Sequence, residues 1–203
     1  MEKAKQALKI TATLTLIFFF LSCNSVVKNT QSDTMLMVTN ITGKDIEDND
    51  VNFLQSDVTQ VDPDTNQPYV TADSATATLA AKSLEPEPAL GTSNYSNILV
   101  TSYTVSYIRS DGKNREGIDV PYSFSGSLSV LVEIDTAVDV SFIIVRESAK
   151  LEPPLINLWE GRGEGPLTVQ AKVDFYGHDM ANHKVKATGY LTIFFANYID
   201  QEG

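Results

Sequence analysis

The feature of this sequence that most constrains its fold is a hydrophobic alternation with a period of two residues. In residues 123–134, SFSGSLSVLVEI, apolar residues recur at every second position from Leu128 onward, with polar residues mostly between them. Residues 167–176 and 185–195 follow the same pattern. Successive side chains of a β-strand point to opposite faces, so this period predicts strands with one face in a core and one in water. Half-buried strands of this kind are typical of antiparallel sheets.

Further segments of the chain extend this all-β pattern. Weaker strands are expected at 35–41, 75–81, 98–108 and 137–145, with LINLW at 155–159 as an eighth candidate. An Asp-Gly turn signal lies at 109–114, and because the next convincing strand begins near Ser123 a longer loop is expected there. A hairpin loop is expected at 176–184. No segment after residue 23 shows the period of an amphipathic helix. We therefore predict an all-β fold: a single antiparallel two-sheet β-sandwich of about seven to eight strands.

In architecture this prediction resembles the immunoglobulin-like and C2-like domains of envelope proteins. The resemblance does not extend to sequence, because the chain has one cysteine and lacks the Cys…Trp…Cys spacing of true immunoglobulin domains. Its single tryptophan, Trp159, lies in a loop-like stretch. Sandwiches of this class serve adhesion, carbohydrate binding, accessory roles and scaffolding alike, so the architecture does not select a function.

The N-terminal segment has the layout of a signal peptide. Residues 1–9 carry three lysines and one glutamate, and residues 10–21, ITATLTLIFFFL, carry no charge. A helix of this uncharged length rises about 18 Å, which is well short of the roughly 30 Å of hydrocarbon that a spanning helix must cross. We therefore expect a cleaved signal helix and not a permanent membrane span.

The residues that follow, Phe20-Leu21-Ser22-Cys23, resemble the lipobox of bacterial lipoprotein precursors, although Phe20 stands where leucine or valine is more usual. By this resemblance, Cys23 receives a diacylglycerol through its sulfur and becomes the N-terminus after cleavage. Two or more acyl chains would make the attachment persistent. The alternative is an ordinary secretory signal with an incidental or buried thiol. We favour lipidation because Cys23 is the only cysteine and directly follows the apolar run.

This interpretation divides the chain into a signal peptide (1–22), a lipidated N-terminus and flexible tether (23–33) and a β-sandwich domain (34–203). It predicts a protein held by its lipid in the bacterial cell envelope. Asn24, the second mature residue, is not the aspartate that retains some lipoproteins in the inner membrane. By that resemblance we expect the outer membrane, with the domain facing the periplasm or the cell surface.

The charge of the mature chain limits its partners. Removal of residues 1–22 leaves 12 basic against 25 acidic residues, a net charge of −13. Such a charge opposes binding to nucleic acid, which depends on lysine and arginine neutralising phosphates. No intramolecular disulfide can form with one cysteine, so stability must come from a core. The expected partners are the membrane, through the lipid, and an unidentified protein or glycan.

Catalytic motifs are absent from the sequence, and metal-binding patterns are weak. There is no G-x-S-x-G, H-E-x-x-H or phosphate-binding glycine loop. His178, Asp179 and His183 share the expected 176–184 loop and could converge on a metal, but we favour solvated loop residues because a zinc site needs more ligands. The sequence therefore predicts a non-enzymatic protein without a required cofactor.

One acidic segment has the spacing of a calcium loop. Asp62, Asp64, Asn66 and Asp73 occupy positions 1, 3, 5 and 12 of a twelve-residue window, the offsets at which EF-hand-like loops place oxygen ligands. Gln67 stands where the sharp turn wants glycine, and position 12 lacks the longer glutamate. The nearby acidic segment 45–50 could add ligands. We favour solvated turns, and keep a calcium site at these four residues as a hypothesis.

Tyrosines suggest one further surface. Tyr103 and Tyr107 fall on one face of the strand expected at 98–108, with Tyr95 and Tyr122 in nearby loops. An exposed tyrosine platform could stack on sugars or on a protein, but inward-facing tyrosines are more common and we favour them.

Taken together, the sequence predicts a lipid-anchored envelope protein that binds a partner or supports an assembly. A calcium-stabilised adhesion or carbohydrate-binding module is the alternative. An enzyme whose residues converge without a linear motif is the third possibility.

Overall fold

Strands account for most of the described residues of the computed structural model, which are 32–85, 93–159 and 165–198. The predicted all-β class is therefore confirmed. The strands are β1 (Thr34–Lys44), β2 (Asp50–Val51), β3 (Phe53–Asp57), β4 (Gln60–Val61), β5 (Pro68–Tyr69), β6 (Asp73–Ser83), β7 (Ile98–Ile108), β8 (Phe124–Val132), β9 (Ala137–Val145), β10 (Leu167–Asp179) and β11 (Lys184–Ala196). The short helices are η2 (Asn94–Ser96), α2 (Glu147–Lys150) and α3 (Leu155–Trp159).

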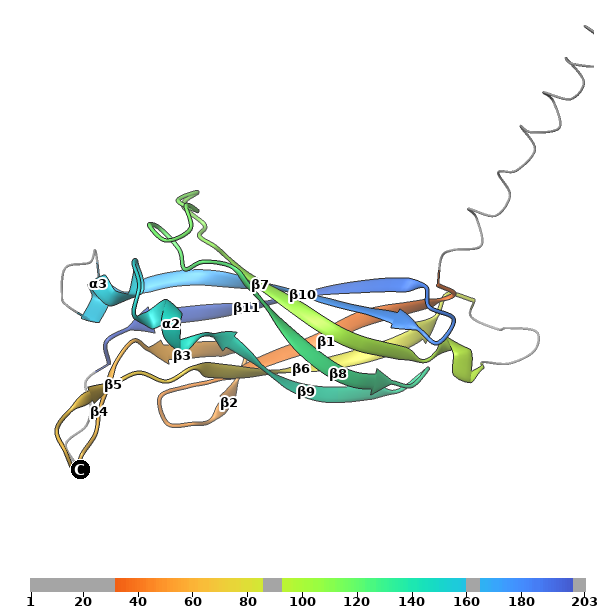
Figure 1. Ribbon diagram of the computed structural model, residues 1–203, viewed down its shortest axis with the longest axis horizontal. Coiled ribbons are helices and arrows are strands. Elements are labelled where there is room, and N and C mark those ends of the chain that lie inside the picture. The colour runs from red at the N-terminus through yellow and green to blue at the C-terminus, as the bar shows by residue number, and fades with distance from the viewer. Residues whose placement is uncertain (1–31, 86–92, 160–164, 199–203) are drawn as a thin grey trace, which may run out of the picture. The chain divides into compact units, whose positions relative to one another are not determined.

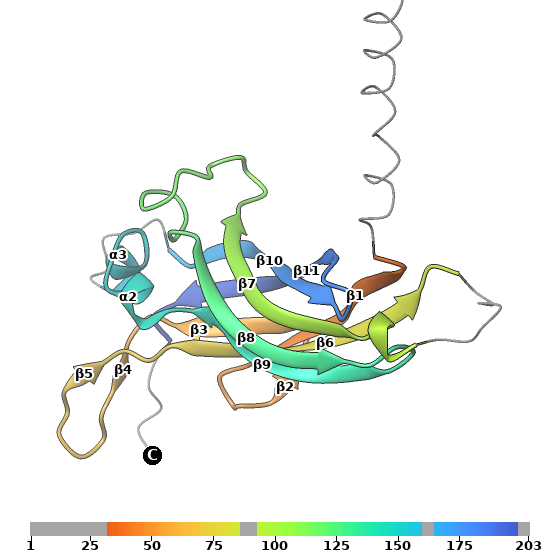
Figure 2. The ribbon, with the colours of Figure 1, turned by 45° about the vertical axis from the view of Figure 1, so that its right-hand side comes forward.

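The strands form two larger sheets and one small hairpin (Figures 1 and 2). One sheet has four strands in the order β2-β1-β6-β9, and the other has five in the order β3-β11-β10-β7-β8. Strands β4 and β5 pair only with each other. Most neighbours are antiparallel, but β3 runs parallel to β11, with Phe53 opposite Thr192. The expectation of purely antiparallel pairing is wrong at this edge, because alternation shows which face a residue takes and not which strand lies beside it.

The two larger sheets share one hydrophobic core. The rings of Tyr103 in β7 and Phe175 in β10 contact the ring of Phe142 in β9, with centroids 5.1 and 5.3 Å apart. The Tyr107 hydroxyl, also from the five-stranded sheet, donates to the carbonyl oxygen of Ile144 in β9 at 2.7 Å. Burial of each such ring stabilises the fold by about 1.5–3 kcal/mol. The core is therefore made by the inner faces of both sheets.

A glycine lets the ring of Tyr103 lie across the neighbouring edge strand. Gly126 of β8 pairs with Tyr103, and a Cβ at this position would overlap the tyrosine ring. The aromatic ring covers the backbone that glycine leaves bare. The polar face of β8 predicted from its serines remains exposed on the other side.

Three predicted segments differ in the structure. Residues 155–159 form helix α3 and not a strand, with Leu155 fully buried and the Ile156 amide donating to the Glu152 carbonyl. A short apolar run does not distinguish a strand from a helical turn. The described residues also contain eleven strands, more than the seven to eight expected, since β2, β3, β4 and β5 lie where no strand was expected. The loop expected at 176–184 is shorter, because β10 continues to Asp179.

The strands give the domain two distinct ends. The entry end is defined by Ser32 and the turns around it, where the Leu84 amide donates to the Asp33 carbonyl and the Met180 amide donates to the Asn97 carbonyl. The loop end lies at the other ends of the same strands. It holds the β7–β8 loop (109–123), the β4–β5 hairpin and helices α2 and α3 (Figure 2).

Candidate functional site

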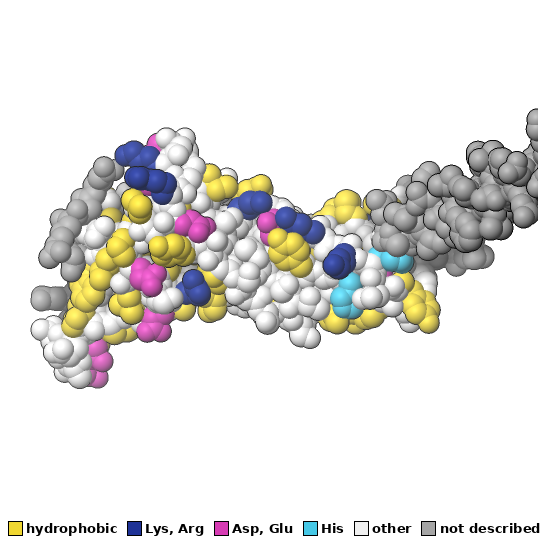
Figure 3. All heavy atoms as spheres, turned by 45° about the horizontal axis from the view of Figure 1, so that its top comes forward, with side chains coloured by type: hydrophobic (Ala, Val, Ile, Leu, Met, Phe, Trp, Pro, Cys, Tyr) yellow, Lys and Arg dark blue, Asp and Glu magenta, His cyan; other side chains and the backbone are white. Residues whose placement is uncertain are grey.

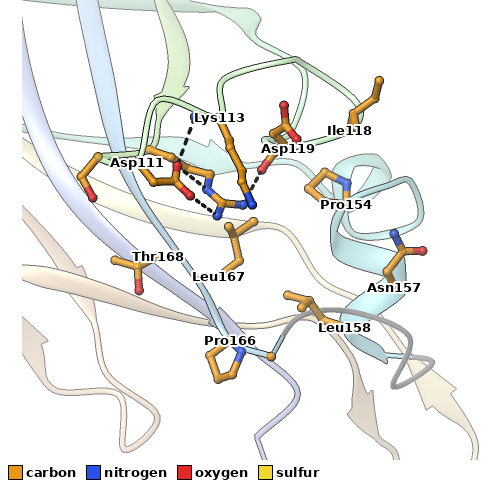
Figure 4. A pocket seen from close by; sticks show the side chains of 13 residues that line it. Asp111, Lys113, Ile118, Asp119, Pro154, Asn157, Leu158, Pro166, Leu167 and Thr168 are labelled. Atoms are coloured by element: carbon orange, nitrogen blue, oxygen red, sulfur yellow. Dashed lines mark hydrogen bonds and ion pairs between the residues drawn. The ribbon is translucent and has the colours of Figure 1, made fainter.

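The loop end contains two cavities, and the first lies between the β7–β8 loop and helix α3. It has a volume of about 500 Å³. Arg109, Asp111 and Lys113 line it from the loop, and Asn157 and Leu158 line it from α3, with the start of β10 between them (Figure 4). The wall therefore combines guanidinium, carboxylate and amide groups with apolar side chains, which suits recognition of a partly polar surface.

The β7–β8 loop is held in one conformation by its own hydrogen bonds. The Arg109 guanidinium contacts both carboxylate oxygens of Asp111, at 3.1 and 2.6 Å, and Asn114 Oδ1 accepts from the Arg109 amide. The Arg115 guanidinium contacts both oxygens of Asp119 at 2.8 and 3.2 Å. These arginine hydrogen bonds hold the pKa values of both aspartates below the usual range. Bidentate pairs of this kind fix geometry as well as charge.

A tight turn then presents apolar side chains from the loop. Gly117 has φ of 72°, and a Cβ at this position would overlap the ring of Tyr122. The adjacent Ile118 and Tyr122 are 59% and 49% exposed. Exposed large apolar residues on an ordered loop carry little folding benefit, and they are the groups that make good contacts with a partner.

The second cavity, about 570 Å³, lies on the other side of the loop end. It is bounded by β3, the β4–β5 hairpin and the turn after β1. Its lining includes four aspartates, one lysine and the rings of two tyrosines: Asp45, Asp48, Asp57, Asp73, Lys44, Tyr69 and Tyr198. Its wall is therefore more acidic than that of the first cavity.

A buried ion pair lies at the wall of this second cavity. Lys150 of α2 is only 1% exposed, and its Nζ donates to Asp73 Oδ1 at 2.9 Å and to the Asp57 carbonyl at 2.7 Å. Ser56 Oγ donates to the other oxygen of Asp73 at 2.6 Å. Burial raises the pKa of Asp73, and the contacts with Lys150 and Ser56 offset this only in part. The pair joins α2, β3 and β6 at the loop end.

The structure does not bring the four predicted calcium residues together. Asp62, Asp64 and Asn66 lie in the β4–β5 hairpin, where Asp62 Oδ1 accepts from the Asp64 amide, while both oxygens of Asp73 bond Lys150 and Ser56. Hydrogen bonds from the turn hold the pKa of Asp62 below its usual range. Within the ranges that the structure describes, no three acidic, histidine or cysteine residues are grouped as metal ligands. Calcium binding stays a prediction that this geometry does not favour.

The two histidines lie at the entry end. His178 is the penultimate residue of β10, and His183 follows in the turn, where its Nδ1 lies 3.0 Å from Asp179 Oδ2. Asp179 is buried and also accepts from the amides of Ala181 and His183. Burial alone would raise the pKa of Asp179, but hydrogen bonds from His183 and Ser32 outweigh it and lower the pKa. Asp179 thus orders the β10–β11 turn.

The four tyrosines considered in the sequence do not form one exposed surface. Tyr103 and Tyr107 are buried in the core, which confirms the inward-facing alternative, whereas Tyr95 and Tyr122 are exposed at opposite ends. Two exposed tyrosines missed by the sequence analysis are Tyr176 and Tyr190, which share the outer face of the five-stranded sheet. The signal that could have identified them was their place on the polar face of the alternating segments, Tyr176 next to Asp174 and Tyr190 between Thr188 and Thr192.

The predicted lipidation site lies outside the described residues. Cys23, the signal peptide and nearly all of the tether precede Ser32, and residues 1–31 are a separate unit from residues 32–203. None of the helices in the described ranges has both the length and the hydropathy needed to cross a bilayer.

No model of a known protein family, no curated protein and no solved structure matches this chain.

Proposed function

We propose that this chain is a non-enzymatic, lipid-anchored protein of the bacterial envelope that binds a partner through its loop end. The observation that carries the proposal is the placement of both cavities and the ordered β7–β8 loop at the end of the strands opposite Ser32. A lipid on Cys23 would attach the chain nine residues before Ser32, a span of at most about 32 Å.

We further propose that the two larger sheets form a β-sandwich of immunoglobulin-like or C2-like architecture. The ring contacts of Phe142 with Tyr103 and Phe175 support it, because they join inner faces of different sheets. In such sandwiches the loops at one end of the strands are the usual recognition surface. The outer membrane, facing the periplasm or the cell surface, remains the location we propose from Cys23 and Asn24.

The loop end has the composition of a protein-binding surface. Exposed Ile118, Tyr122 and Trp159 supply apolar contact area, and the paired charges of Arg109 and Arg115 surround it. Aromatic and arginine residues are enriched where proteins bind each other. Because the loop is ordered by its own hydrogen bonds, binding loses less conformational entropy than it would with a mobile loop.

Site-specific photo-crosslinking in living cells tests this proposal. A photoreactive amino acid replaces Ile118 at the loop end, and in a matched strain it replaces the exposed Ser141 on β9 of the four-stranded sheet. We expect a discrete crosslinked adduct from position 118 and none from position 141. Equal adducts from both positions, or none from position 118, would contradict binding through the loop end.

A further inference from the structure

The outer face of the five-stranded sheet carries a second surface, separate from the loop end, whose charge is opposite to that of the chain. The outward charged side chains of β7, β8, β10 and β11 are three lysines, Lys172, Lys184 and Lys186, and one aspartate, Asp174. The whole chain has a net charge of −11. Figure 3 shows lysine or arginine side chains spaced along this side of the domain next to hydrophobic ones. We call the surface formed by Lys172, Asp174, Tyr176, Lys186, Thr188 and Tyr190 the sheet platform.

Two exposed tyrosines lie at defined positions on this platform. Tyr176 lies opposite Lys186, and Tyr190 lies opposite Lys172, in the β10–β11 register. They are 36% and 53% exposed. Four strand positions separate them, which is about 13 Å along the strands. Tyrosine combines an apolar ring face with a hydroxyl, so two of them on a flat sheet can each lie against one ring of an extended polymer.

The groups between the tyrosines are fixed by mutual contacts. Asp174 Oδ2 bonds Lys172 at 3.2 Å and Lys186 at 3.1 Å, and Asp174 Oδ1 accepts from Thr188 Oγ1 at 2.6 Å. Lys186 Nζ lies 5.3 Å from the centre of the Tyr176 ring. Asp174 therefore positions two ammonium groups beside the rings while the platform keeps an excess of positive charge.

We infer that the sheet platform binds an acidic polysaccharide chain, with its sugar rings against Tyr176 and Tyr190 and its carboxylates near Lys172 and Lys186. A polysaccharide supplies apolar ring faces, hydroxyls and spaced negative charges, and the platform offers a complement to each. Nucleic acid fits less well, since its dense charge is repelled by the acidic remainder of the protein. Anionic membranes are usually bound by clusters of four to eight basic residues, more than this face carries.

Affinity electrophoresis of the purified, processed full-length chain in detergent tests the inference, with polygalacturonate as the acidic probe and dextran as the neutral one. We expect polygalacturonate alone to retard the protein, and added salt to weaken the binding, as for other contacts with polyanions. Cys23→Ser should bind equally well, because this surface does not depend on the lipid. Polygalacturonate binding therefore tests the platform independently of whether Cys23 carries a lipid.

Variants on the platform should weaken the binding while matched variants elsewhere should not. Tyr176→Ala with Tyr190→Ala, and separately Lys172→Gln with Lys186→Gln, should each weaken it by roughly tenfold or more, corresponding to the loss of about 1.4 kcal/mol of binding free energy. The matched control is Tyr95→Ala with Lys82→Gln, an exposed tyrosine and lysine away from this face. Unchanged melting temperatures would show that the variants fold.

Three outcomes overturn the inference: no retardation by polygalacturonate, equal retardation by dextran, or equal loss of binding in the control variant. A fourth outcome is binding of phosphatidylglycerol vesicles by the Cys23→Ser variant, lost when Lys172→Gln and Lys186→Gln are added, without binding of polygalacturonate. It would identify the platform as a membrane contact and overturn the inference as well.

Discussion

Lys150 has the least usual surroundings of any lysine that the structure describes. Lysine is almost never fully buried unless it is paired, because removal of an ammonium from water is costly. Here Nζ is bonded to Asp73 and to the Asp57 carbonyl, so the charge is compensated. The sequence alone does not reveal this role, since Lys150 follows Ala149 in a short polar segment and its partners are 77 and 93 residues away.

Replacement of Lys150 by methionine should strongly destabilise the domain. Removal of one partner from a buried pair leaves an uncompensated charge and typically costs about 3–5 kcal/mol. We expect a lower midpoint of urea unfolding. The double variant Lys150→Met with Asp73→Asn should recover much of the loss, because no buried charge remains. If the double variant is no more stable than the single one, the pair is not the origin of the effect.

The loss of stability in Lys150→Met should also depend on pH. Burial raises the pKa of Asp73 above the usual 3.8, and removal of Lys150 takes away an interaction that lowers it. A raised pKa means that the folded state binds more protons than the unfolded state, so stability falls as pH rises from 3.8 through the folded pKa. The difference in free energy of unfolding between Lys150→Met and the unaltered protein should therefore become smaller toward acid pH.

At the scale of elements, the sequence predicted the long strands and missed the short ones. Strands β8, β10 and β11 have nine to thirteen residues and a clear two-residue period, so their faces could be assigned. Strands β2, β4 and β5 have two residues each, too few to show any period. The parallel pairing of β3 with β11 joins distant parts of the chain, and only tertiary packing decides it.

The candidate site was less predictable for the same reason. The Asp-Gly signal and the expected longer loop located the segment around 109–114. Only the three-dimensional contacts show that Arg109 pairs with Asp111 and Arg115 with Asp119. They also show that α3 forms the opposite wall of the cavity. The four predicted calcium residues do not come together in the structure, because Asp73 lies in β6 and its carboxylate contacts Lys150 and not the β4–β5 hairpin.

Asp119→Asn should loosen the β7–β8 loop with little effect on global unfolding. Asp119 accepts from the Arg115 amide and guanidinium, and an amide group cannot accept this paired set equally well. We expect faster hydrogen exchange of amides in 109–123 and a weaker adduct from position 118. The matched control, Asp135→Asn, removes an exposed pair with Lys82 and should leave exchange in this loop unchanged.

The same loop should open in acid. The Arg115 hydrogen bonds lower the pKa of Asp119 below 3.8 in the folded protein. A carboxyl whose pKa is lowered by folding stabilises the folded state fully at a pH above its pKa in the unfolded state. This stabilisation is lost as the pH falls through its pKa in the folded state. Loop protection in the unaltered protein should therefore decline only below pH 3.8. Constant protection through that range would show that the Arg115 pair does not order the loop.

At the scale of the whole molecule, the entry end, the loop end and the sheet platform lie on different parts of the domain. The chain enters the domain at Ser32, beside the β10–β11 turn, while the β7–β8 loop and both cavities lie at the other end of the same strands. The sheet platform occupies the outer face between these ends. Neither proposed binding surface therefore includes the end of the strands at which Ser32 lies.

The proposed lipid anchor predicts how the chain should behave in the cell. Cys23→Ser should block diacylglycerol attachment and signal cleavage, so the protein should incorporate no labelled fatty acid and should keep its longer precursor length on a gel. Persistent association needs two or more acyl chains, and all of them depend on this thiol. Ser25→Ala, two residues later, is the matched control and should be processed normally. If the Cys23→Ser variant is still processed to mature length, an ordinary secretory signal replaces the lipoprotein interpretation.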